Sequence, residues 1–427
     1  MHHFAYRGDD LYCEEVPVAR IATEIGTPVY VYSHATLTRH FQALDEAFAG
    51  IPHLICFALK ANANLAVLRL FADLGGGLDV VSGGELFRGL KAGVPPQRIV
   101  YAGVGKTRDE IAAALKADIL MFNVESEQEM ETLNAVAIGL GRRARVAVRV
   151  NPDVDPKTHP YISTGLKQSK FGIDIGKALA LYEVASRLPG LEVAGIHQHI
   201  GSQITSVQPF VDSLAKTAGL VRQLRERGTA IRYFDIGGGL GIRYKDEEPP
   251  LPAEYARALT GVLGLLGVTV VLEPGRMLVG NAGILVAQVL YTKQTPAKRF
   301  LVVDAGMNDL ARPSLYGSHH GIQPVRKAAG RPEITADVVG PICESGDFLA
   351  KDRALPDFEP GEWMAVMSAG AYGHTMSSNY NARPRAPEVL VRGDRYYVVR
   401  ERETYEDLVR GERTLDELAA MERDRRG

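Results

Sequence analysis

Cysteine is scarce in this chain of 427 residues, and charge of one sign is missing. The three cysteines (Cys13, Cys56 and Cys343) are few and odd in number, which argues against a disulfide framework and for a reducing compartment. The formal net charge is −2, so no basic excess points to nucleic acid and no acidic tail points to disorder. We therefore expect a globular protein with no nucleic-acid partner.

Long hydrophobic runs are also missing. The longest apolar region, around residues 259–272, is interrupted by glycines and threonines and ends at Glu273, so it is too short for a membrane span. The N-terminus, Met-His-His-Phe, has no basic segment followed by an apolar one, so we expect no signal peptide. These absences predict a cytoplasmic protein with no membrane partner.

From residue 54 onward, short β-rich runs alternate with helical patterns. Eight such strands, each followed by a helix over about 220 residues, have the count and length of a (β/α)8 TIM barrel. A doubly wound open sheet is the rival interpretation, but eight parallel strands in regular succession favour closure. The predicted strands are 54–59, 78–81, 99–102, 119–122, 145–150, 191–199, 231–236 and 269–273.

After about residue 282 the pattern becomes mainly β, and residues 388–400 predict a hairpin around Arg392-Gly-Asp. A chain of this length is expected to form two domains. We predict an α/β barrel over 34–281 and a barrel- or sandwich-like β domain over 1–33 and 282–427, joined by the N-terminal strand. The charged tail from Glu401 has a helical pattern, and the long polar connection 151–171 is of the kind that often carries function.

Polar residues gather at the predicted C-terminal ends of the barrel strands, where TIM barrels bind their ligands. Each has a plain alternative: a lysine that only stops a strand, a glycine-rich tight turn, a satisfied core histidine, or a glutamate in an ordinary salt bridge. Their convergence on one barrel mouth favours a shared site. The segments are Phe57-Ala-Leu-Lys-Ala-Asn62, His197-Gln-His-Ile-Gly-Ser-Gln203, Gly237-Gly-Gly-Leu-Gly241 and Glu273-Pro-Gly-Arg276.

This combination suits pyridoxal 5'-phosphate. A glycine-rich loop presents backbone N–H groups to a phosphate, and barrels often hold phosphate with the loops after strands seven and eight. Lys60 would form a Schiff base with the cofactor aldehyde, and the flat ring of His199 could stack on the cofactor. Glu273 would keep the ring nitrogen protonated, so that the ring can accept electrons from a bond breaking at Cα.

No metal-ligand spacing is evident, because we expect His197 and His199 to point to opposite faces of a strand. The sequence therefore predicts no metal. Two further residues stay open. Asp79 and Glu85 either organise the cofactor lysine or are plain strand-end and helix-start residues.

Three more motifs narrow the assignment: His159-Pro-Tyr-Ile-Ser-Thr-Gly-Leu-Lys-Gln-Ser-Lys-Phe-Gly172, Gly340-Pro-Ile-Cys-Glu-Ser-Gly-Asp347, and Tyr380-Asn-Ala-Arg-Pro-Arg385 after Tyr372. With the strand-end segments, they resemble the diaminopimelate decarboxylase family of fold type III, alanine-racemase-like decarboxylases. The resemblance spans essentially the whole chain, in order. It implies the decarboxylation of meso-2,6-diaminopimelate to L-lysine and CO2, the last step of lysine biosynthesis, with pyridoxal phosphate as cofactor.

The resemblance also implies roles for individual residues. Lys60 and Cys343 would be catalytic, and Cys343 would donate the proton to Cα after carbon dioxide leaves. The cofactor would be held by Lys60, His199, Ser202, Gly238, Gly239, Glu273, Pro274, Gly275, Arg276 and Tyr372. The substrate would be bound by Arg276, Arg312, Tyr316, Glu344 and Tyr372. In this family Cys343 and Glu344 reach the site from the partner subunit, so a homodimer with shared active sites is implied.

The residue types at the distal end of the site bear on the choice of substrate. Glu344 with Arg276 or Arg312 supplies both signs for an ammonium and a carboxylate, whereas an ornithine-type enzyme would want acids alone. Alternatives are a related decarboxylase acting on ornithine, lysine, arginine or carboxynorspermidine, or a non-catalytic cofactor-binding regulator. For Cys343 the alternative is a buried structural thiol.

Overall fold

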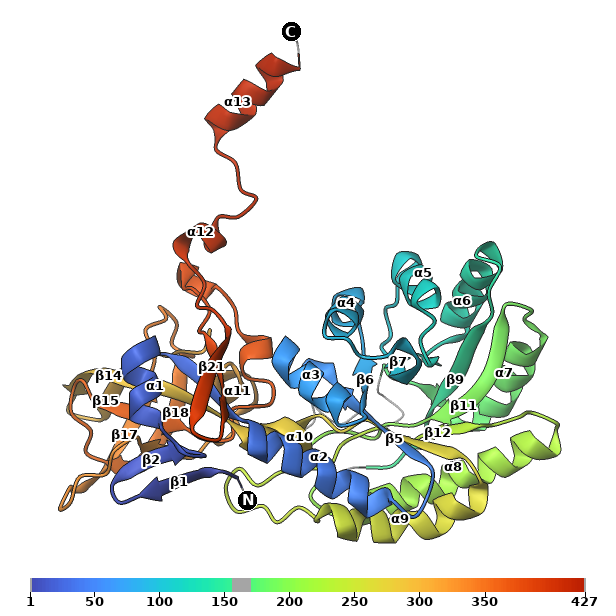
Figure 1. Ribbon diagram of the computed structural model, residues 1–427, viewed down its shortest axis with the longest axis horizontal. Helices are drawn as coiled ribbons and strands as arrows, with labels where there is room; N and C mark the ends of the chain where they lie inside the picture. Colours follow the sequence, from blue (N-terminus) through green and yellow to red (C-terminus); the bar gives the residue numbers. More distant parts are fainter. Residues whose placement is uncertain (1, 156–169, 426–427) are drawn as a thin grey trace.

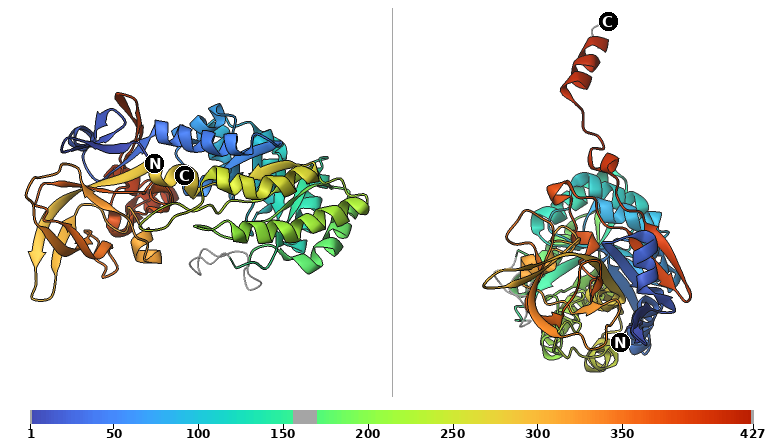
Figure 2. Two further views of the ribbon diagram at one scale, coloured as in Figure 1. Left: turned by 90° about the horizontal axis from the view of Figure 1, so that it is seen from below. Right: turned by 90° about the vertical axis from the view of Figure 1, so that its left-hand side faces the viewer.

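The computed structural model describes residues 2–155 and 170–425 of the chain (Figure 1). Most of the predicted 159–172 motif therefore lies outside the described residues. The helix-covered half, at the right of Figure 1, packs beside a β-rich half at the left, and the C-terminal helix stands away from both. Figure 2 shows the same two halves from below and from the side.

Eight parallel strands close into a barrel, which confirms the predicted TIM fold and excludes the open-sheet rival. The hydrogen-bonded order is β9-β11-β12-β13-β5-β6-β7-β8, and β8 pairs with β9 to close the circle. The two-residue strand β10 (Ile173–Asp174) pairs with Val150 and Asn151, at the end of β9 beyond the residues that pair with β8. The barrel strands are β5 (His53–Ala58), β6 (Gly77–Val80), β7 (Ile99–Tyr101), β8 (Met121–Val124), β9 (Ala144–Asn151), β11 (Leu191–His197), β12 (Tyr233–Asp235) and β13 (Thr269–Leu272).

Side-chain caps fix where several barrel helices begin. Asn64 accepts from the N–H of Ala66, and Ser82 accepts from the N–H of Glu85, each satisfying a donor that a helix leaves unpaired. Each cap stabilises its helix by about 1 kcal/mol and keeps the residues before it in the strand-end loop. The helices are α3 (Leu65–Asp73), α4 (Gly83–Lys91), α5 (Arg108–Ala117), α6 (Glu127–Gly139), α7 (Ile175–Arg187), α8 (Gln208–Glu226) and α9 (Pro252–Leu266).

The expectation that a helix follows every barrel strand was wrong at the eighth strand. Only the four-residue α10 (Arg276–Val279) follows β13, and the chain then enters the β-rich half. The missing outer position is filled by α2 (His34–Phe48), which precedes the first strand and packs against α9 and α3. An apolar stripe on α2 that includes Phe41 and Phe48 supplies the contact, and both side chains are buried.

The β-rich half is a sheet with the order β18-β17-β15-β14-β4-β20-β21. The N-terminal strand β4 (Val29–Ser33) lies between β14 and β20, as predicted, and β20 and β21 form the predicted hairpin. The other strands are β14 (Gly283–Gln294), β15 (Arg299–Val303), β16 (Ile322–Pro324), β17 (Glu333–Val339), β18 (Phe348–Pro356), β19 (Trp363–Val366), β20 (Glu388–Arg392) and β21 (Arg395–Arg400).

Three parts of the β-rich half escaped the sequence pattern, and the short strand β16 (Ile322–Pro324) is one of them. Strand β18 was not predicted, because Lys351-Asp-Arg353 interrupts its apolar alternation where the pairing with β17 is irregular. At the N-terminus the strands β1 (Phe4–Arg7), β2 (Asp10–Cys13) and β3 (Val16–Pro17) were not predicted, and α1 (Val18–Ile25) follows them. The tail forms α12 (Tyr405–Leu408) and α13 (Leu415–Asp424), in line with its helical pattern.

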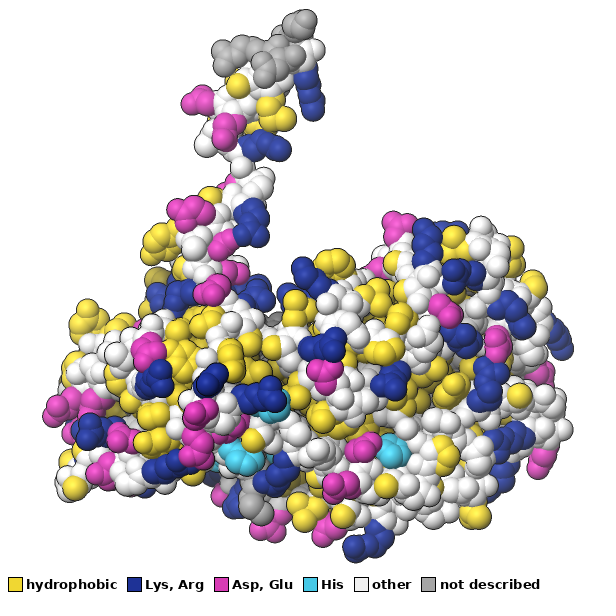
Figure 3. Space-filling model, viewed as in Figure 1, with side chains coloured by type: hydrophobic (Ala, Val, Ile, Leu, Met, Phe, Trp, Pro, Cys, Tyr) yellow, Lys and Arg dark blue, Asp and Glu magenta, His cyan; other side chains and the backbone are white. Residues whose placement is uncertain are grey.

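Charge is distributed evenly on the face drawn in Figure 3, where lysine and arginine side chains alternate with aspartate and glutamate. Among the helices of residues 2–155 and 170–425, none is both long and apolar enough to cross a membrane.

Candidate active site

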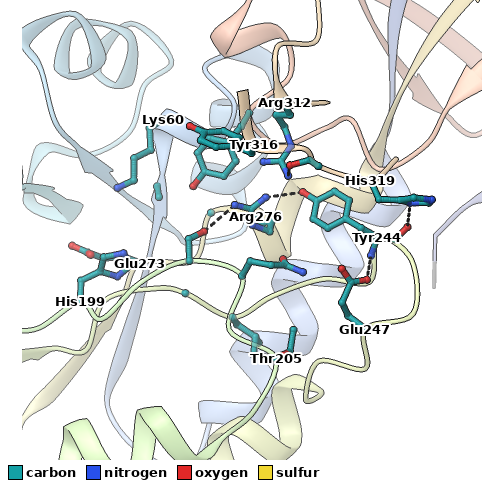
Figure 4. A pocket seen from close by; sticks show the side chains of 18 of the residues that line it. Lys60, His199, Thr205, Tyr244, Glu247, Glu273, Arg276, Arg312, Tyr316 and His319 are labelled. Atoms are coloured by element: carbon teal, nitrogen blue, oxygen red, sulfur yellow. Dashed lines mark hydrogen bonds between the residues drawn. The ribbon is translucent and has the colours of Figure 1, made fainter. Parts of the chain in front are cut away.

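A cavity of about 650 Å³ opens at the C-terminal mouth of the barrel, against the β-rich half (Figure 4). Side chains from both halves line it, so the site forms where the two meet. Ten residues predicted for the site lie on its wall: Lys60, His199, Ser202, Gly239, Glu273, Gly275, Arg276, Arg312, Tyr316 and Tyr372.

Lys60 lies in the single 3-10 turn η1 (Leu59–Ala61) that follows β5. Its Nζ donates to Oδ2 of Asp79 at 2.8 Å, and the carboxylate of Asp79 is fully buried on β6. Burial alone would lower the pKa of Lys60, but the neighbouring Asp79, Tyr372 and Glu273 outweigh it and raise that pKa. Asp79, whose role the sequence left open, is thus the contact that holds the lysine in place.

The ring of His199 is hydrogen-bonded to the glycine-rich loop. The backbone N–H of Gly238 donates to Nδ1 of His199 at 3.2 Å, so this nitrogen carries no proton. Burial, with the charges of Arg149 and Lys60, holds the pKa of His199 well below its usual value. The ring is therefore neutral and fixed, as a flat stacking surface requires.

The glycines of this loop are needed because there is no room for side chains. A Cβ on Gly238 would meet the carbonyl oxygen of Glu273 at 2.0 Å, and Gly239 has a φ of +119°. Gly238 and Pro274 lie behind the cavity wall, whereas Gly239 and Gly275 lie on it. The cradle that suits a phosphate is thus formed by Gly239, Gly275 and the hydroxyl of Ser202.

Glu273 is the buried carboxylate of the barrel mouth. His197 lies 3.3 Å from Oε2 of Glu273, and Nδ2 of Asn123 donates both to Oε1 of Glu273 at 3.2 Å and to Oδ2 of Asp235 at 2.9 Å. Burial opposes ionisation of Glu273, but His197 and Lys60 outweigh it and lower its pKa. Burial and the charge of Glu273 raise the pKa of Asp235. Glu273 therefore holds the negative charge and Asp235 holds the proton.

The prediction that His197 and His199 diverge was wrong. Strand β11 ends at His197, so His199 lies on the loop beyond the strand, and both rings lie next to Glu273. Ligand atoms of His197, Asp235 and Glu273 lie within 4.8 Å of one another, a cluster that sequence spacing missed because it spans three strands. The shared proton and the amide of Asn123 account for the close approach of the two carboxyl groups.

Two buried arginines form the far end of the cavity. Arg276 and Arg312 are each 5% exposed. Arg276 donates to the hydroxyl of Ser202 at 3.0 Å, and Arg312 donates to the hydroxyl of Ser318 at 3.1 Å. Nε of Arg276 is buried and has no hydrogen-bond partner among the described residues.

Cys343 and Glu344 lie apart from this cavity. Both side chains are exposed, and neither is on the cavity wall, so the alternative of a buried structural thiol for Cys343 is wrong. The buried carboxylate of Asp347 shapes their loop by accepting from the N–H groups of Met307 and Ile342. Oδ1 of Asn381 accepts from the N–H of Cys343 at 2.7 Å. The backbone of the loop is well anchored, and the side chains of Cys343 and Glu344 face the outside.

Glu85, left open by the sequence, lies at the start of α4. Its Oε2 accepts from the N–H of Val81 at 2.7 Å, and burial, opposed only in part by this bond, raises its pKa to about 7. Sequence reasoning gave no role to Phe171 and Gln203, although both lie within the motifs quoted above. It also missed cavity-lining residues on loops that carry no motif: Thr205, Tyr244, Lys245, Glu247, Gly317, Ser318 and His319. For Tyr244 the position just after the glycine-rich run was the available signal.

Comparison with known proteins identifies the family. A family model described as the pyridoxal-binding domain of pyridoxal-dependent decarboxylases matches residues 34–280. A diaminopimelate decarboxylase of Aquifex aeolicus is 51% identical over 408 residues, covering 95% of this chain and 96% of that protein. One of Pseudomonas aeruginosa is 53% identical over 415 residues, covering 97% of this chain and 100% of that protein. The chain belongs to the diaminopimelate decarboxylase family. It is accordingly a pyridoxal-phosphate-dependent carboxy-lyase.

Solved structures of the family agree with the fold. The diaminopimelate decarboxylase of Helicobacter pylori, solved with L-lysine, superposes with a TM-score of 0.90 at 44% identity, covering 94% of this chain and 100% of that one. The diaminopimelate decarboxylase of "m. jannaschii", also solved with L-lysine, gives a TM-score of 0.92 at 38% identity, covering 98% of this chain and 100% of that one. A lysine/ornithine decarboxylase of Vibrio vulnificus, at 22% identity and a TM-score of 0.78, shares the fold.

Proposed function

We propose that this chain decarboxylates meso-2,6-diaminopimelate to L-lysine and CO2. The observation that carries the proposal is one cavity with Lys60 and Glu273 at one end and two buried arginines at the other. That arrangement suits an amino acid whose reacting carbon is held at one end while a second carboxylate is recognised at the other. The names of the relatives above support this choice over decarboxylases of monocarboxylic amino acids.

The residues present fit pyridoxal phosphate. Lys60 would attach the cofactor, Gly239, Gly275 and Ser202 would surround its phosphate, and Glu273 would face its ring nitrogen. His199 would lie against the ring, and the hydroxyl of Tyr372, 3.3 Å from the position of a Cβ on Gly275, would border it. When bound, the cofactor supplies an electron sink for the bond that breaks at Cα.

The protein's own groups prepare that step electrostatically. Glu273 is kept ionised by His197, so it can hold a proton on the ring nitrogen opposite it. Asp79 orients the side chain of Lys60 in the absence of substrate. Because Glu273, His197 and Asp79 are buried, their mutual interactions are little screened by water.

The substrate's second carboxylate would pair with Arg276 and Arg312, with Tyr316 beside them. Arginine binds carboxylates in a fork geometry, and both guanidinium groups border the cavity. The ammonium at the same end of the substrate needs an acid, and Glu344 is our choice for it. Cys343 would then donate the proton to Cα.

Since Cys343 and Glu344 are exposed and lie off the cavity wall, we propose that a second copy of the chain supplies them. The working form would be a homodimer in which each site uses two chains. We also propose that the protein is cytoplasmic, with neither a nucleic-acid nor a membrane partner. For the domains we propose the division into 34–281 and 1–33 with 282–427, supported by the family match over 34–280 and by the pairing of β4 with β14 and β20.

The direct test is release of CO2 by the cofactor-loaded protein from a panel of amino acids. We expect turnover of meso-diaminopimelate and at least about a hundredfold lower kcat/KM for ornithine, lysine and arginine, because those leave the buried arginines without their carboxylate. No CO2 from meso-diaminopimelate, or equal turnover of ornithine, would refute the proposal.

A further inference from the structure

Tyr244 is held rigidly at the far end of the cavity, on the loop that follows the glycine-rich run. The side-chain amide of Gln203 both donates to the carbonyl and accepts from the N–H of Ile242, at 2.6 and 3.1 Å. Oε2 of Glu247 accepts from the N–H of Tyr244 at 3.0 Å, and Nδ1 of His319 donates to its carbonyl at 3.2 Å (Figure 4). The backbone on both sides of Tyr244 is thus fixed by buried or half-buried side chains.

The side chain of Tyr244 contacts both buried arginines by different parts of its structure. Its hydroxyl accepts from Nη1 of Arg276 at 2.7 Å. Its ring lies under the guanidinium of Arg312, with 5.0 Å between Cζ and the ring centroid. The distance from Cζ of Arg276 to the same centroid is 5.7 Å. One residue therefore touches both of the cations proposed to bind the substrate's second carboxylate.

The two arginines need such a residue because their charges repel each other in a buried setting. Burial lowers the pKa of Arg312, and the neighbouring charge of Arg276 adds to that effect. Among residues 2–155 and 170–425, neither guanidinium forms an ion pair with a carboxylate. The electron-rich face of an aromatic ring is the kind of neutral surface that stabilises a cation without neutralising it.

The other contacts of Arg312 are neutral as well. Its Nε donates to Nε2 of His320 at 3.4 Å, and burial, with the charge of Arg312, lowers the pKa of His320 to about 3. Nδ1 of His320 donates to the carbonyl of Met367 at 2.9 Å, which fixes the neutral ring in an accepting orientation. The pair of arginines thus keeps its full positive charge for a ligand.

We infer that Tyr244 is a positioning residue that sets the spacing and orientation of Arg276 and Arg312 for a carboxylate on the ligand's distal end. The inference rests on the proposed function, because it takes the two arginines to be the carboxylate receptor. It divides the work between two parts of one side chain: the hydroxyl orients Arg276, and the ring supports Arg312.

Two substitutions separate these parts. Tyr244→Phe removes the hydroxyl and keeps the ring, so it frees Arg276 and leaves Arg312 supported. Tyr244→Leu removes both. Tyr291→Phe, at an exposed position on β14, is the matched control, because it deletes a tyrosine hydroxyl far from the cavity wall.

The decisive measurement is the affinity of the cofactor-loaded protein for L-lysine and for cadaverine, by calorimetry. Cadaverine is L-lysine without its carboxylate, so the ratio of the two dissociation constants reports on carboxylate recognition alone. We expect Tyr244→Phe to weaken L-lysine about fivefold to tenfold and Tyr244→Leu about fiftyfold, with cadaverine changed less than about twofold. Tyr291→Phe should change neither constant.

The outcomes distinguish this inference from the proposal beneath it. If Arg312→Lys weakens L-lysine selectively while both Tyr244 variants keep the wild-type ratio, the role of Tyr244 is refuted and the proposed function stands. If Arg312→Lys and Arg276→Lys also keep the wild-type ratio of the two dissociation constants, the arginines do not bind the carboxylate. The role of Tyr244 is then refuted as well. Equal weakening of L-lysine and cadaverine by Tyr244→Phe would show a general structural effect and would also refute the inference. Should Tyr244→Leu not fold, the near-isosteric Tyr244→Phe carries the test.

Discussion

The barrel mouth and the loop that carries Cys343 and Glu344 are organised in opposite ways. At the mouth, Lys60 contacts the carboxylate of Asp79 and Glu273 contacts His197, all within the same chain. On the loop, buried Asp347 and the amide of Asn381 hold the backbone, while the side chains of Cys343 and Glu344 face outward. The charged groups of the barrel mouth have their partners within one chain. The side chains of Cys343 and Glu344 do not line the cavity of their own chain.

The physical reason for this difference is burial. A charge taken out of water needs a partner, so the polar groups of the mouth had to be assembled as a network. Exposed polar side chains need no partner from the protein, because water forms hydrogen bonds with them. Under the proposed function, the mouth would carry the cofactor chemistry, and proton donation with one part of substrate binding would need a second chain.

The largest expected effect comes from removing Lys60 from the barrel mouth. Lys60→Ala removes the attachment point and should lower kcat at least about ten-thousandfold and abolish the visible absorption of the attached cofactor. Lys293→Ala, at an exposed position on β14, is the control and should leave both unchanged. Retention of the lysine-linked absorption band in Lys60→Ala would contradict the assignment of Lys60.

The next effect separates charge from shape within the mouth. Glu273→Gln keeps the size of the side chain and removes its charge, so kcat should fall about a hundredfold to a thousandfold. Asp235→Asn is the matched change at the carboxyl group that already holds a proton, and its cost should stay below about tenfold. Absorption spectra and kcat of both variants check this. Equal losses would mean that the charge is shared rather than held by Glu273.

The outward-facing loop is tested by mixing inactive chains. Cys343→Ala should lower kcat about a hundredfold through loss of the proton donor, while cofactor binding is retained. If sites are shared, refolded equal mixtures of Lys60→Ala and Cys343→Ala chains should regain about a quarter of the wild-type activity, since half of the dimers contain one intact site. Activity no higher than that of the separate variants would show that each site uses one chain.

The smallest effect concerns Glu85, at the rim of the mouth. Its pKa is about 7 in the folded protein against an ordinary 4.5, so the folded state binds an extra proton between those values. The resulting stabilisation is present at low pH and is lost as the pH rises through about 7. Glu85→Gln keeps the acceptor for the N–H of Val81 and has no group that ionises. Its free energy of unfolding relative to wild type should therefore increase by roughly 1–2 kcal/mol from pH 5 to pH 8. Urea unfolding at both pH values measures the difference, and a constant difference would contradict the raised pKa.

Much of the mouth was predictable because its residues follow strands directly. Lys60, His199 and Glu273 come at the ends of apolar runs, and a parallel barrel brings such positions together. Tyr244 was harder to place, because it lies on a loop whose course depends on tertiary contacts such as that of Gln203 with Ile242. The helix α2 was assigned to no barrel position, since periodicity shows that a helix is amphipathic and not which surface it covers.

Strand β4 has a consequence for synthesis of the chain. All five of its residues are buried, and its neighbours β14 and β20 begin at Gly283 and Glu388. A ribosome must therefore add some 350 residues, the whole barrel among them, before Val31 meets its partner Val389. Until then the buried strand β4 has an unpaired edge, so the nascent chain exposes an apolar strand at residues 29–33 while the barrel is being made.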